Sequence, residues 1–361
     1  MNITIVAGAR PNFMKIAPII EAIIEKKKEG FNINYRLVHT GQHYDKNLSG
    51  TFFEELNIPL PDTNLEVKSG SQAEQTAAIM IGFENELKQN PCDLVMFVGD
   101  VTSTMACTIV AKKAHIKVAH VEAGIRSGDL RMPEEINRIV TDSLTDYFFT
   151  TSNYANKNLI KLGVSESKIF FVGNVMIDTL IKNKNRLQKP SLWEDINLSE
   201  KKYMVMTLHR PSNVDEEYRL KQLITQIVTL GKNHPIVFPV HPRTQKLLSG
   251  LDLNFKNLHY VSPLGYLEFN YLVKNALVVI TDSGGITEET TVMNIPCITL
   301  RDSTERPETC DIGTNVLVGS DSNKIENAFK ILLSGTWKQG AVPKLWDGQT
   351  ATRIINHLIE I

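Results

Sequence analysis

Short apolar, β-branched runs alternate with longer stretches of helical periodicity along the whole chain, and this alternation constrains the fold more than any other feature. It is typical of parallel α/β units, in which a helix follows each strand and returns the chain to the same edge of the sheet. In the first half we expect strands at Ile3–Ala7, Asn34–His39, Leu94–Val98, Lys117–Val121, Tyr147–Thr150 and Ile169–Val172. In the second half we expect them at Tyr203–Thr207, Ile236–Val240, Leu258–Val261, Val278–Ile280, Pro296–Leu300 and Asn315–Val318.

A polar, weakly patterned stretch at residues 182–202 interrupts the alternation once. A chain of 361 residues is too long for one ordinary core and about right for two. We therefore predict an α/β protein with two doubly wound, Rossmann-like domains that face a cleft. The first domain is expected at residues 1–172 and the second at 173–351, with a closing helix at 352–361.

The chain carries 39 basic and 40 acidic side chains, for a net charge of −1. A general polyanion binder carries a basic excess, so this balance disfavours nucleic acids and membrane surfaces as partners. The four cysteines lie far apart without a CxxC pair, which argues against a zinc site or a disulfide framework. The first residues run directly into a strand without a basic region, and no apolar stretch is long enough for a bilayer. We expect a cytoplasmic protein without a bound metal.

Titratable residues follow the expected strands at the points where the strands end. Five of the nine histidines do so, namely His39, His43, His120, His209 and His241. In open parallel sheets, ligands bind outside the carboxyl ends of the strands. A polar loop explains one such histidine, but this many titratable groups on one rim indicate an active cleft.

The segment Asp282–Gly285 (DSGG) follows a buried-looking strand and enters a helix, which predicts a phosphate site. Glycines let backbone N–H groups approach an anion, and the helix N-terminus adds partial positive charge. Glu288 and Glu289 on that helix could reach the two hydroxyls of a ribose. The structural alternative is a serine N-cap with glycines that permit a tight turn. The chain contains neither GxGxxG nor GxxxxGK[ST], so a nicotinamide dinucleotide and ATP are disfavoured and no cofactor is predicted.

Candidate acid–base groups follow the strands of the first half. Asp100 and Glu122 each follow an apolar strand, and Glu134 lies in the first turn of an expected helix. A carboxylate at the end of a buried strand is costly without a partner, which favours a functional role for Glu122. The structural alternatives are a loop-holding role for Asp100 and a favourable helix-dipole contact for Glu134. Arg10 and Lys15 supply positive charge near these acids and suit an anionic substrate.

Further binding candidates lie in the second half. His209 and His241 could contact phosphate or sugar, although a histidine at a strand end is often a hydrogen-bonded loop residue. Arg306 would face the same cleft. Phe269 could stack on a base, with ordinary core packing as the alternative.

Several of these segments together resemble the non-hydrolysing UDP-N-acetylglucosamine 2-epimerases, a family with a GT-B-like fold. Among the matching segments are Gly8–Pro11, Gly99–Thr104, His120–Asp129, Pro133–Arg138, Thr281–Gly285 and Glu305–Glu308. The resemblance implies that the catalytic residues are Asp100, Glu122, Glu134 and His209. It also implies that diphosphate, ribose and uracil are held by Ser283, Gly284, Gly285, Glu289 and Phe269.

The resemblance carries expectations about assembly and regulation as well. The last helix would cross back onto the first domain, and the protein would be a homodimer. Members of this branch bind a second UDP-sugar beside the active site as an allosteric activator, and Gln42 and Arg210 fall in the matching segments. The substrate would be a UDP-sugar, and the product would supply N-acetylmannosamine-type precursors for surface polysaccharide.

The expected reaction is reversible epimerisation at C2 of UDP-N-acetylglucosamine. The proton on C2 lies beside no carbonyl, so without a nicotinamide the available route is elimination of UDP to a glycal followed by re-addition. Inversion needs acid–base groups on two faces, which a cluster of carboxylates with a histidine supplies. Four alternatives remain open: an epimerase of a UDP-diacetamido sugar acid, a hydrolysing epimerase that releases UDP, a GT-B glycosyltransferase and a non-catalytic nucleotide-sugar sensor. The intact Glu305–Glu308 motif favours UDP-N-acetylglucosamine over the sugar acid.

Overall fold

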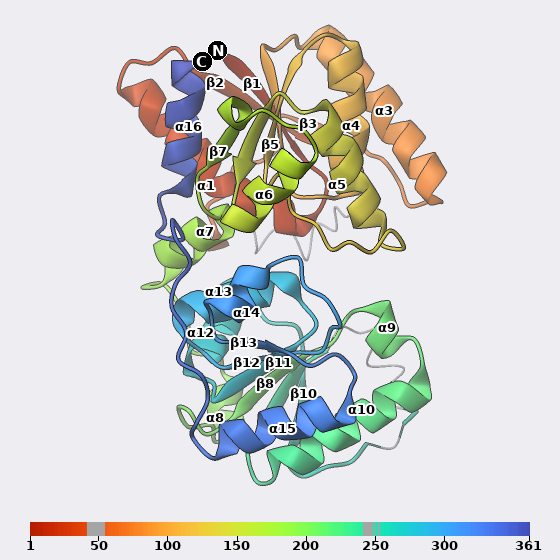
Figure 1. The fold of residues 1–361 in the computed structure, drawn as a ribbon, viewed down its shortest axis with the longest axis vertical. Helices are drawn as coiled ribbons and strands as arrows, with labels where there is room; N and C mark the ends of the chain where they lie inside the picture. Colours follow the sequence, from red (N-terminus) through yellow and green to blue (C-terminus); the bar gives the residue numbers. More distant parts are fainter. Residues whose placement is uncertain (42–54, 241–247, 249, 252) are drawn as a thin grey trace. The chain divides into compact units, whose positions relative to one another are not determined.

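A computed structural model describes residues 1–41, 55–240, 248, 250–251 and 253–361. The chain divides into two compact units (Figure 1). The first comprises residues 1–182 and 344–361, and the second comprises residues 183–343. The expected α/β class is confirmed, because each unit contains a parallel sheet whose strands alternate with helices.

The sheet of the first unit has the strand order β3-β2-β1-β4-β5-β6-β7, and all the paired strands run parallel. Its strands are β1 (Asn2–Ala7), β2 (Asn34–His39), β3 (Thr63–Asn64), β4 (Leu94–Val98), β5 (Lys117–Val121), β6 (Tyr147–Thr150) and β7 (Ile169–Phe171). Its helices are α1 (Arg10–Lys28), α3 (Gln72–Gln89), α4 (Thr102–Lys113), α5 (Pro133–Leu144), α6 (Asn153–Lys161), α7 (Val175–Asn183), whose last residue enters the second unit, and α16 (Thr350–Glu360), with a 3-10 turn at Glu166–Lys168.

The sheet of the second unit has the order β10-β9-β8-β11-β12-β13 and is also parallel. Its strands are β8 (Met204–Thr207), β9 (Ile236–Pro239), β10 (Leu258–Val261), β11 (Val278–Thr281), β12 (Cys297–Thr299) and β13 (Asn315–Leu317). Its helices are α8 (Leu192–Asp195), α9 (Pro211–Val214), α10 (Glu217–Gly231), α12 (Tyr266–Asn275), α13 (Gly284–Met293), α14 (Pro307–Asp311) and α15 (Ser322–Leu333).

Each sheet has one point where the strand order reverses direction. In the first unit the chain starts at β1, winds outward to β2 and then returns to place β4 on the other side of β1. In the second unit β8 stands between β9 and β11 in the same way. Ligands of open α/β sheets bind outside the carboxyl ends of the strands at such reversals. The topology therefore predicts ligand sites at the loops after β1 and β4 and at those after β8 and β11.

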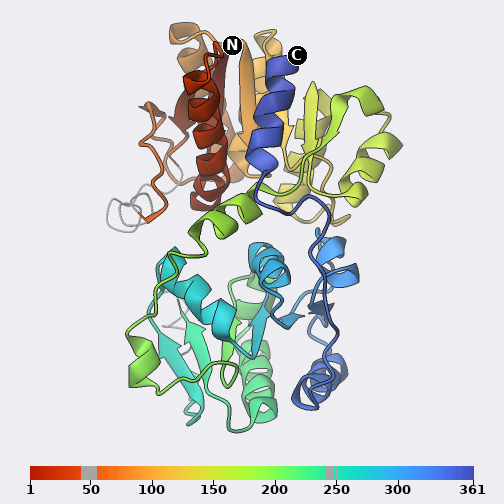
Figure 2. The same cartoon turned by 90° about the vertical axis from the view of Figure 1, so that its left-hand side faces the viewer.

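The last helix belongs to the first unit, although the second unit separates the two in sequence. Helix α16 packs against α1, and Figure 2 shows the two side by side. The Asp178 carboxylate on α7 accepts the backbone N–H groups of Thr350 and Ala351 at 3.2 and 2.7 Å, and so holds the first turn of α16. The division of the chain after Lys182 lies later than the boundary at 172 that we expected, because α7 packs with these helices.

Within the described part of the chain, no helix is both long and apolar enough to cross a membrane.

Candidate functional site

The loops after β1 and β4 are joined by one side chain. Asn12, which is 3% exposed in the first turn of α1, accepts the N–H groups of Gly8 and Ala9 through its Oδ1 atom, at 3.2 and 2.9 Å. Its Nδ2 atom donates to the carbonyl of Val98 at 2.8 Å. Asn12 thereby fixes the ends of the two central strands relative to each other. Gly99, the next residue after β4, turns the chain with φ of +77°.

Glu122 follows β5 and lies beside this turn. Its backbone has φ of +69°, a left-handed conformation that costs free energy in a non-glycine residue. Its side chain is 3% exposed and forms an ion pair with Lys15 of α1, with 2.7 Å between Nζ and Oε2. A Cβ atom added to Gly99 would lie 3.6 Å from that Nζ atom and 3.9 Å from that Oε2 atom. The structure therefore brings the expected residues Lys15 and Glu122 together next to the loop that bears Asp100.

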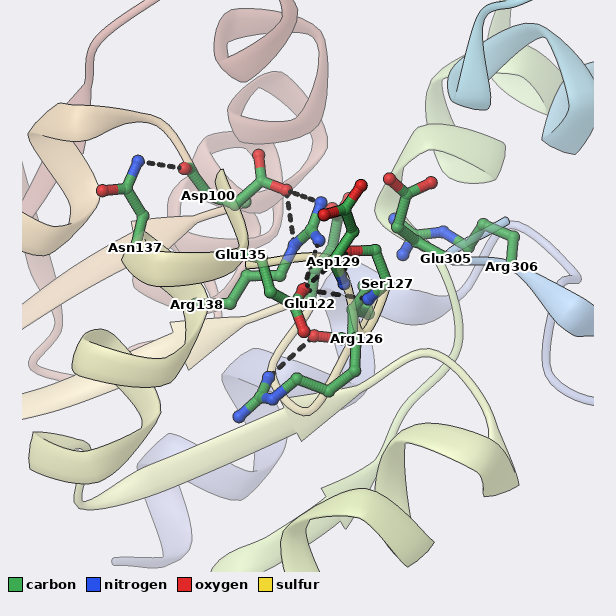
Figure 3. A network of polar contacts seen from close by, with 12 residues as sticks. Asp100, Glu122, Arg126, Ser127, Asp129, Glu135, Asn137, Arg138, Glu305 and Arg306 are labelled. Carbon is green, nitrogen blue, oxygen red and sulfur yellow. Dashed lines mark hydrogen bonds and ion pairs between the residues drawn. The ribbon is translucent and has the colours of Figure 1, made fainter. Parts of the chain in front are cut away.

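Asp100 is held by a second cation. Arg138 of α5 approaches the Asp100 Oδ2 atom with its Nε and Nη2 atoms at 2.8 and 2.5 Å (Figure 3). The Nη1 atom of the same guanidinium donates to Glu135 at 2.8 Å. Asn137, from the same helix, donates to the Asp100 carbonyl at 2.9 Å. The Asp100 carboxyl is about one-third exposed, so it keeps access to solvent while it is paired.

Glu135 extends this network to the loop after β5. Its carboxylate accepts the N–H groups of Ser127 and Gly128 at 2.9 and 3.1 Å. Burial raises the pKa of Glu135, but these N–H groups and Arg138 outweigh burial and hold that pKa below its usual value. Glu135 and Arg138 were not among the expected site residues, because a pattern in sequence does not reveal which arginine pairs with which acid.

Glu134 lies one residue earlier on α5 and is exposed. It makes no side-chain hydrogen bond within the described part of the chain. Among the four residues expected to be catalytic, it is the one whose side chain the fold leaves unconstrained. Glu134 lies in the first turn of α5, where a negative charge interacts favourably with the helix dipole.

A buried cluster lies behind the loop after β4. Asp142 on α5 contacts the Nδ1 atom of His120 at 2.7 Å and Arg126 at 2.7 Å, and it also accepts the Gly124 N–H at 3.0 Å. The Nε2 atom of His120 contacts the Gly99 carbonyl at 2.9 Å. Burial raises the pKa of Asp142, but the contacts with His120 and Arg126 outweigh burial and lower it. His120, which the sequence placed on the rim, is thus an internal support for the turn that precedes Asp100.

In the second unit, Asp282 organises the loop after β8. The Asp282 side chain is fully buried and its Oδ1 atom lies 2.7 Å from the Nδ1 atom of His209. It also accepts the backbone N–H groups of His209 and Arg210 and the Nδ2 group of Asn213. Burial raises the Asp282 pKa, but these partners outweigh burial and lower it. The sequence placed Asp282 in the phosphate motif without a role of its own.

Helix α13 begins at Gly284, two residues after Asp282. Ser283 occupies the N-cap position, but its side chain does not cap the helix, so the N-terminal N–H groups remain without that partner. A Cβ atom added to Gly284 would meet only the Nη1 atom of Arg301, at 3.8 Å. That Nη1 atom is buried and has no hydrogen-bond partner among the described residues, while Nη2 pairs with Glu305 at 2.6 Å. The start of α13 has the features of an anion site.

Glu289 lies inside the second unit rather than on its surface. It is 4% exposed, and its Oε1 atom accepts the hydroxyl of Tyr266 at 2.9 Å and the Asn270 amide at 3.4 Å. Burial raises the pKa of Glu289 to about 7, partly offset by these hydrogen bonds. Both partners come from α12, a contact between two helices that the sequence pattern did not reveal.

A second buried group of charges lies beside Glu289. Arg306 forms an ion pair with Glu288. Burial raises the pKa of Glu308 to about 7, while neighbouring Arg306 lowers it. Neither carboxyl oxygen of Glu308 has a hydrogen-bond partner within the described part of the chain. Arg306 therefore belongs to an internal network, and its expected contact with the substrate stays a prediction.

The remaining expected residues are placed as follows. Phe269 on α12 is partly buried and packs against the apolar cluster that includes Trp193 and Leu272. Arg210 lies 3.9 Å from Glu305. Gln42, His43, His241 and the side chain of Arg10 lie outside the described residues. No group of three or more acidic, histidine or cysteine side chains in the described residues is arranged to hold a metal ion, and the absence of a metal stays a prediction.

The sequence of this chain is similar to those of known proteins. The UDP-N-acetylglucosamine 2-epimerase family profile matches residues 25–359. A UDP-N-acetylglucosamine 2-epimerase from Methanocaldococcus jannaschii is 40% identical over 371 residues, which cover 99% of this chain and 99% of that protein. A UDP-2,3-diacetamido-2,3-dideoxy-D-glucuronate 2-epimerase from Pseudomonas aeruginosa is 36% identical over 366 residues, which cover 100% of both.

Solved structures agree. The crystal structure of the Methanocaldococcus jannaschii UDP-GlcNAc 2-epimerase in complex with UDP-GlcNAc and UDP matches with a TM-score of 0.89 at 40% identity, over 100% of both chains. The UDP-GlcNAc 2-epimerase from Neisseria meningitidis, bound to UDP-GlcNAc, matches with a TM-score of 0.89 at 28% identity. The resemblance inferred from the motifs is thereby confirmed at the level of the family. The chain belongs to the UDP-N-acetylglucosamine 2-epimerase family.

Proposed function

We propose that this protein interconverts UDP-N-acetylglucosamine and UDP-N-acetylmannosamine by a non-hydrolysing route. The observation that carries the proposal is the pair of carboxylates beside the reversal of the first sheet, Glu122 against Lys15 and Asp100 against Arg138. Two carboxyl groups at the ends of the neighbouring strands β4 and β5 are suited to moving a proton to and from carbon. The names of the relatives supply the nucleotide sugar.

The chemistry runs through elimination and return. A base removes the proton from C2, and the electron pair of that bond forms the C1=C2 double bond. The C1–O bond breaks at the same time, and its electron pair leaves with the UDP oxygen. A protonated group then delivers a proton to the opposite face of C2 while the UDP oxygen bonds to C1 again. Asp100, Glu122 and Glu134 are the proposed acid–base groups, and they act with His209.

The second unit supplies the nucleotide site in this proposal. The uncapped start of α13, at Ser283 to Gly285, would hold the diphosphate and retain it for the return step. Glu289 would accept the ribose hydroxyls, and Phe269 would lie near the uracil. Lys15, Arg10, His241 and Arg306 complete the proposed set of binding residues.

Incubation with UDP-N-acetylglucosamine in deuterated water, followed by NMR of the products, tests the proposal. We expect UDP-N-acetylmannosamine that is deuterated at C2 with its UDP attached, and deuterium in the recovered substrate. Free UDP with free N-acetylmannosamine would show a hydrolysing epimerase instead. An unchanged substrate in the presence of a folded protein would overturn the proposal.

A second substrate deserves the same assay, because one relative at 36% identity is a UDP-2,3-diacetamido-2,3-dideoxy-D-glucuronate 2-epimerase. Its sugar carries a carboxylate and a second acetamido group. Comparison of kcat/KM for the two UDP-sugars decides which is the substrate, and we expect UDP-N-acetylglucosamine to be preferred by more than tenfold.

We further propose a homodimer that binds a second UDP-N-acetylglucosamine as an activator. Support for the dimer comes from apolar side chains that the first unit leaves exposed, Ile81 on α3 at 64% and Ile136 on α5 at 47%. Light scattering after gel filtration measures the mass. For activation, Arg210→Ala should abolish the acceleration that added UDP-N-acetylglucosamine gives to the reverse reaction, while Gln42→Ala tests the other expected contact.

A further inference from the structure

Asp282 is the most completely enclosed carboxylate near the start of α13, and the proposed reaction assigns it no role. It is the residue between β11 and the N-cap of α13, and its exposed fraction is 0%. Within the described part of the chain, its hydrogen-bond donors come from the neighbouring loop after β8 and from α9, which follows that loop. The hydrogen bonds are donated by the N–H of His209 at 3.1 to 3.2 Å, the N–H of Arg210 at 3.0 Å and the Nδ2 of Asn213 at 3.0 Å, together with the His209 ring.

The contact with the ring defines which nitrogen carries the proton. An ionised carboxylate only accepts hydrogen bonds, so the 2.7 Å contact requires a proton on Nδ1 of His209. In the neutral ring the lone pair then lies on Nε2, the nitrogen that faces away from Asp282. The His209 side chain is 61% exposed, so this nitrogen is accessible to a ligand.

The same carboxylate fixes the backbone from which the ring projects. It holds the N–H groups of His209 and Arg210, so both the main chain and the ring of His209 are set by one buried group. Asn213 donates to Asp282 and also to the Leu300 carbonyl at 3.1 Å, which ties the loop to the end of β12. These hydrogen bonds connect the ends of β8, β11 and β12, and together they fix the orientation of the His209 ring.

Other charged groups near this loop pair with each other. Arg301 and Arg210 both approach Glu305, at 2.6 and 3.9 Å. Within the described part of the chain, the acidic group that contacts the His209 ring is Asp282.

We propose that Asp282 is a positioning residue that holds His209 in the Nδ1–H form and presents Nε2 to the departing and returning diphosphate at the start of α13. The inference rests on the proposed function, in which His209 is an acid–base group. The arrangement is that of a buried acid that orients a catalytic histidine and selects its tautomer.

The test is Asp282→Asn, with Asn213→Ala as the matched control. In Asp282→Asn the new amide can still accept the backbone N–H groups, but its NH₂ group donates toward Nδ1 and drives the ring proton to Nε2. Asn213→Ala removes a hydrogen bond from the same carboxylate and leaves the contact with the ring in place. Circular dichroism of both variants establishes that the fold is retained.

The first readout is NMR of the full-length protein labelled with ¹⁵N-histidine, which needs no activity. The His209 signals are assigned by their loss in His209→Gln. We expect the neutral ring to be Nδ1-protonated in the wild type and in Asn213→Ala, and Nε2-protonated in Asp282→Asn. An unchanged tautomer in Asp282→Asn would overturn the proposal.

The second readout is turnover of UDP-N-acetylglucosamine. We expect kcat to fall by about 10²-fold or more in Asp282→Asn with little change in UDP affinity, and by less than about fivefold in Asn213→Ala. Equal losses in the two variants would show a merely structural role and overturn the proposal. Failure of the proposed function is recognised separately, because the wild type would then be inactive while the tautomer change still supports the positioning of His209 by Asp282.

Discussion

The two units share the order of six strands but differ in the partners of particular carboxyl groups. In the first unit the carboxylates near the sheet reversal each contact a cation: Glu122 contacts Lys15, Asp100 contacts Arg138 and Asp142 contacts Arg126. In the second unit Glu289 and Glu308 are buried with pKa values of about 7, and the partners of Glu289 are a hydroxyl and an amide.

The difference shows that the topology fixes where a site lies, whereas the partners of each carboxyl group fix what it does. Lys15 and Arg138 hold the carboxyl groups of Glu122 and Asp100 at the ends of neighbouring strands, where the proposed proton transfer would take place. Burial raises the pKa of Glu289 to about 7, and its neutral donors offset this only in part, so further hydrogen bonds from a ligand would favour its ionised form. One sheet edge is therefore suited to proton transfer and the other to ligand binding.

The largest expected effect comes from neutralising the carboxylates of the first unit. Glu122→Gln and Asp100→Asn should each lower kcat by at least about 10²-fold, because an acid or base is lost. UDP affinity should change little, since the nucleotide is expected on the second unit. Steady-state kinetics with calorimetric titration of UDP measures both. A variant that keeps near-wild-type turnover would remove that residue from the proposed acid–base set.

Glu134 sharpens the same comparison. It is exposed and unpaired in the described structure, unlike Asp100 and Glu122, yet the resemblance makes it catalytic. We expect Glu134→Gln to lower kcat by at least about 10²-fold as well. Near-wild-type turnover would leave only its helix-dipole role. Glu84→Gln, at a surface ion pair with Lys88 on α3, is the control that should change neither activity nor affinity.

The sequence predicted the strands of both units closely. Each expected strand lies within one residue of its observed bounds, because a buried parallel strand is a compact apolar run with a polar residue after it. The two-residue strand β3 was not expected, since a strand of that length has no periodicity to detect. Helix α7 was placed on the other side of the domain boundary, because its contacts with α1 and α16 come from distant parts of the chain.

The site was predictable as a set of residue types but not as a set of pairs. Strand ends identified Asp100, Glu122 and His209, because topology alone brings strand ends to one edge. Their partners Arg138 and Asp282 were not identified, since the choice of partner depends on side-chain directions across separate elements. The contact of Glu289 with a ribose stays a prediction, and its buried hydrogen bond with Tyr266 was not identified from the sequence.

A stability measurement compares how the two units hold their helices. Asp178→Ala removes the acceptor of two buried N–H groups at the start of α16 and should lower the free energy of unfolding of the first unit by about 2 kcal/mol. Asp321→Ala removes the exposed cap of α15 in the second unit, where Asp321 accepts the N–H groups of Asn323 and Lys324, and should cost about 1 kcal/mol.

Denaturant unfolding with hydrogen exchange locates each loss. We expect faster exchange in α16 and α1 for Asp178→Ala, and in α15 alone for Asp321→Ala. Equal and purely local effects would show that α16 is an appendage rather than part of the first unit.

The nucleotide site of the second unit is tested by Gly284→Val. A side chain there has room in the protein, because its Cβ atom would meet only Arg301 at 3.8 Å, but it would occupy the approach to the N-terminus of α13. UDP affinity should fall by more than about tenfold, or ~1.4 kcal/mol, while uridine affinity and the melting temperature stay near wild type. Gly82→Val on α3, where a Cβ would meet Leu65 at 3.4 Å, is the matched control. Unchanged UDP affinity in Gly284→Val would place the diphosphate elsewhere.

The smallest expected effect is a pH dependence that only the second unit should show. The pKa of Glu289 is raised to about 7 by burial, so the group is mostly protonated at pH 6 and mostly ionised at pH 8. Ribose hydroxyls donate to the ionised form, so binding favours loss of the proton and uridine affinity should rise several-fold, to at most about tenfold, from pH 6 to pH 8. Uridine is the probe because it carries no phosphate that titrates in this range.

Two variants separate Glu289 from other titrating groups. Glu289→Gln cannot ionise, so its uridine affinity should be lower, by the loss of hydrogen bonds worth roughly 1–3 kcal/mol, and independent of pH. Tyr266→Phe removes a hydrogen bond that favours the ionised form of Glu289, so its pH midpoint should move upward from that of the wild type. Calorimetric titration at four pH values measures all three proteins. A wild-type affinity that is flat with pH, or a slope that persists in Glu289→Gln, would show that Glu289 does not contact the ribose and that the two units differ in burial alone.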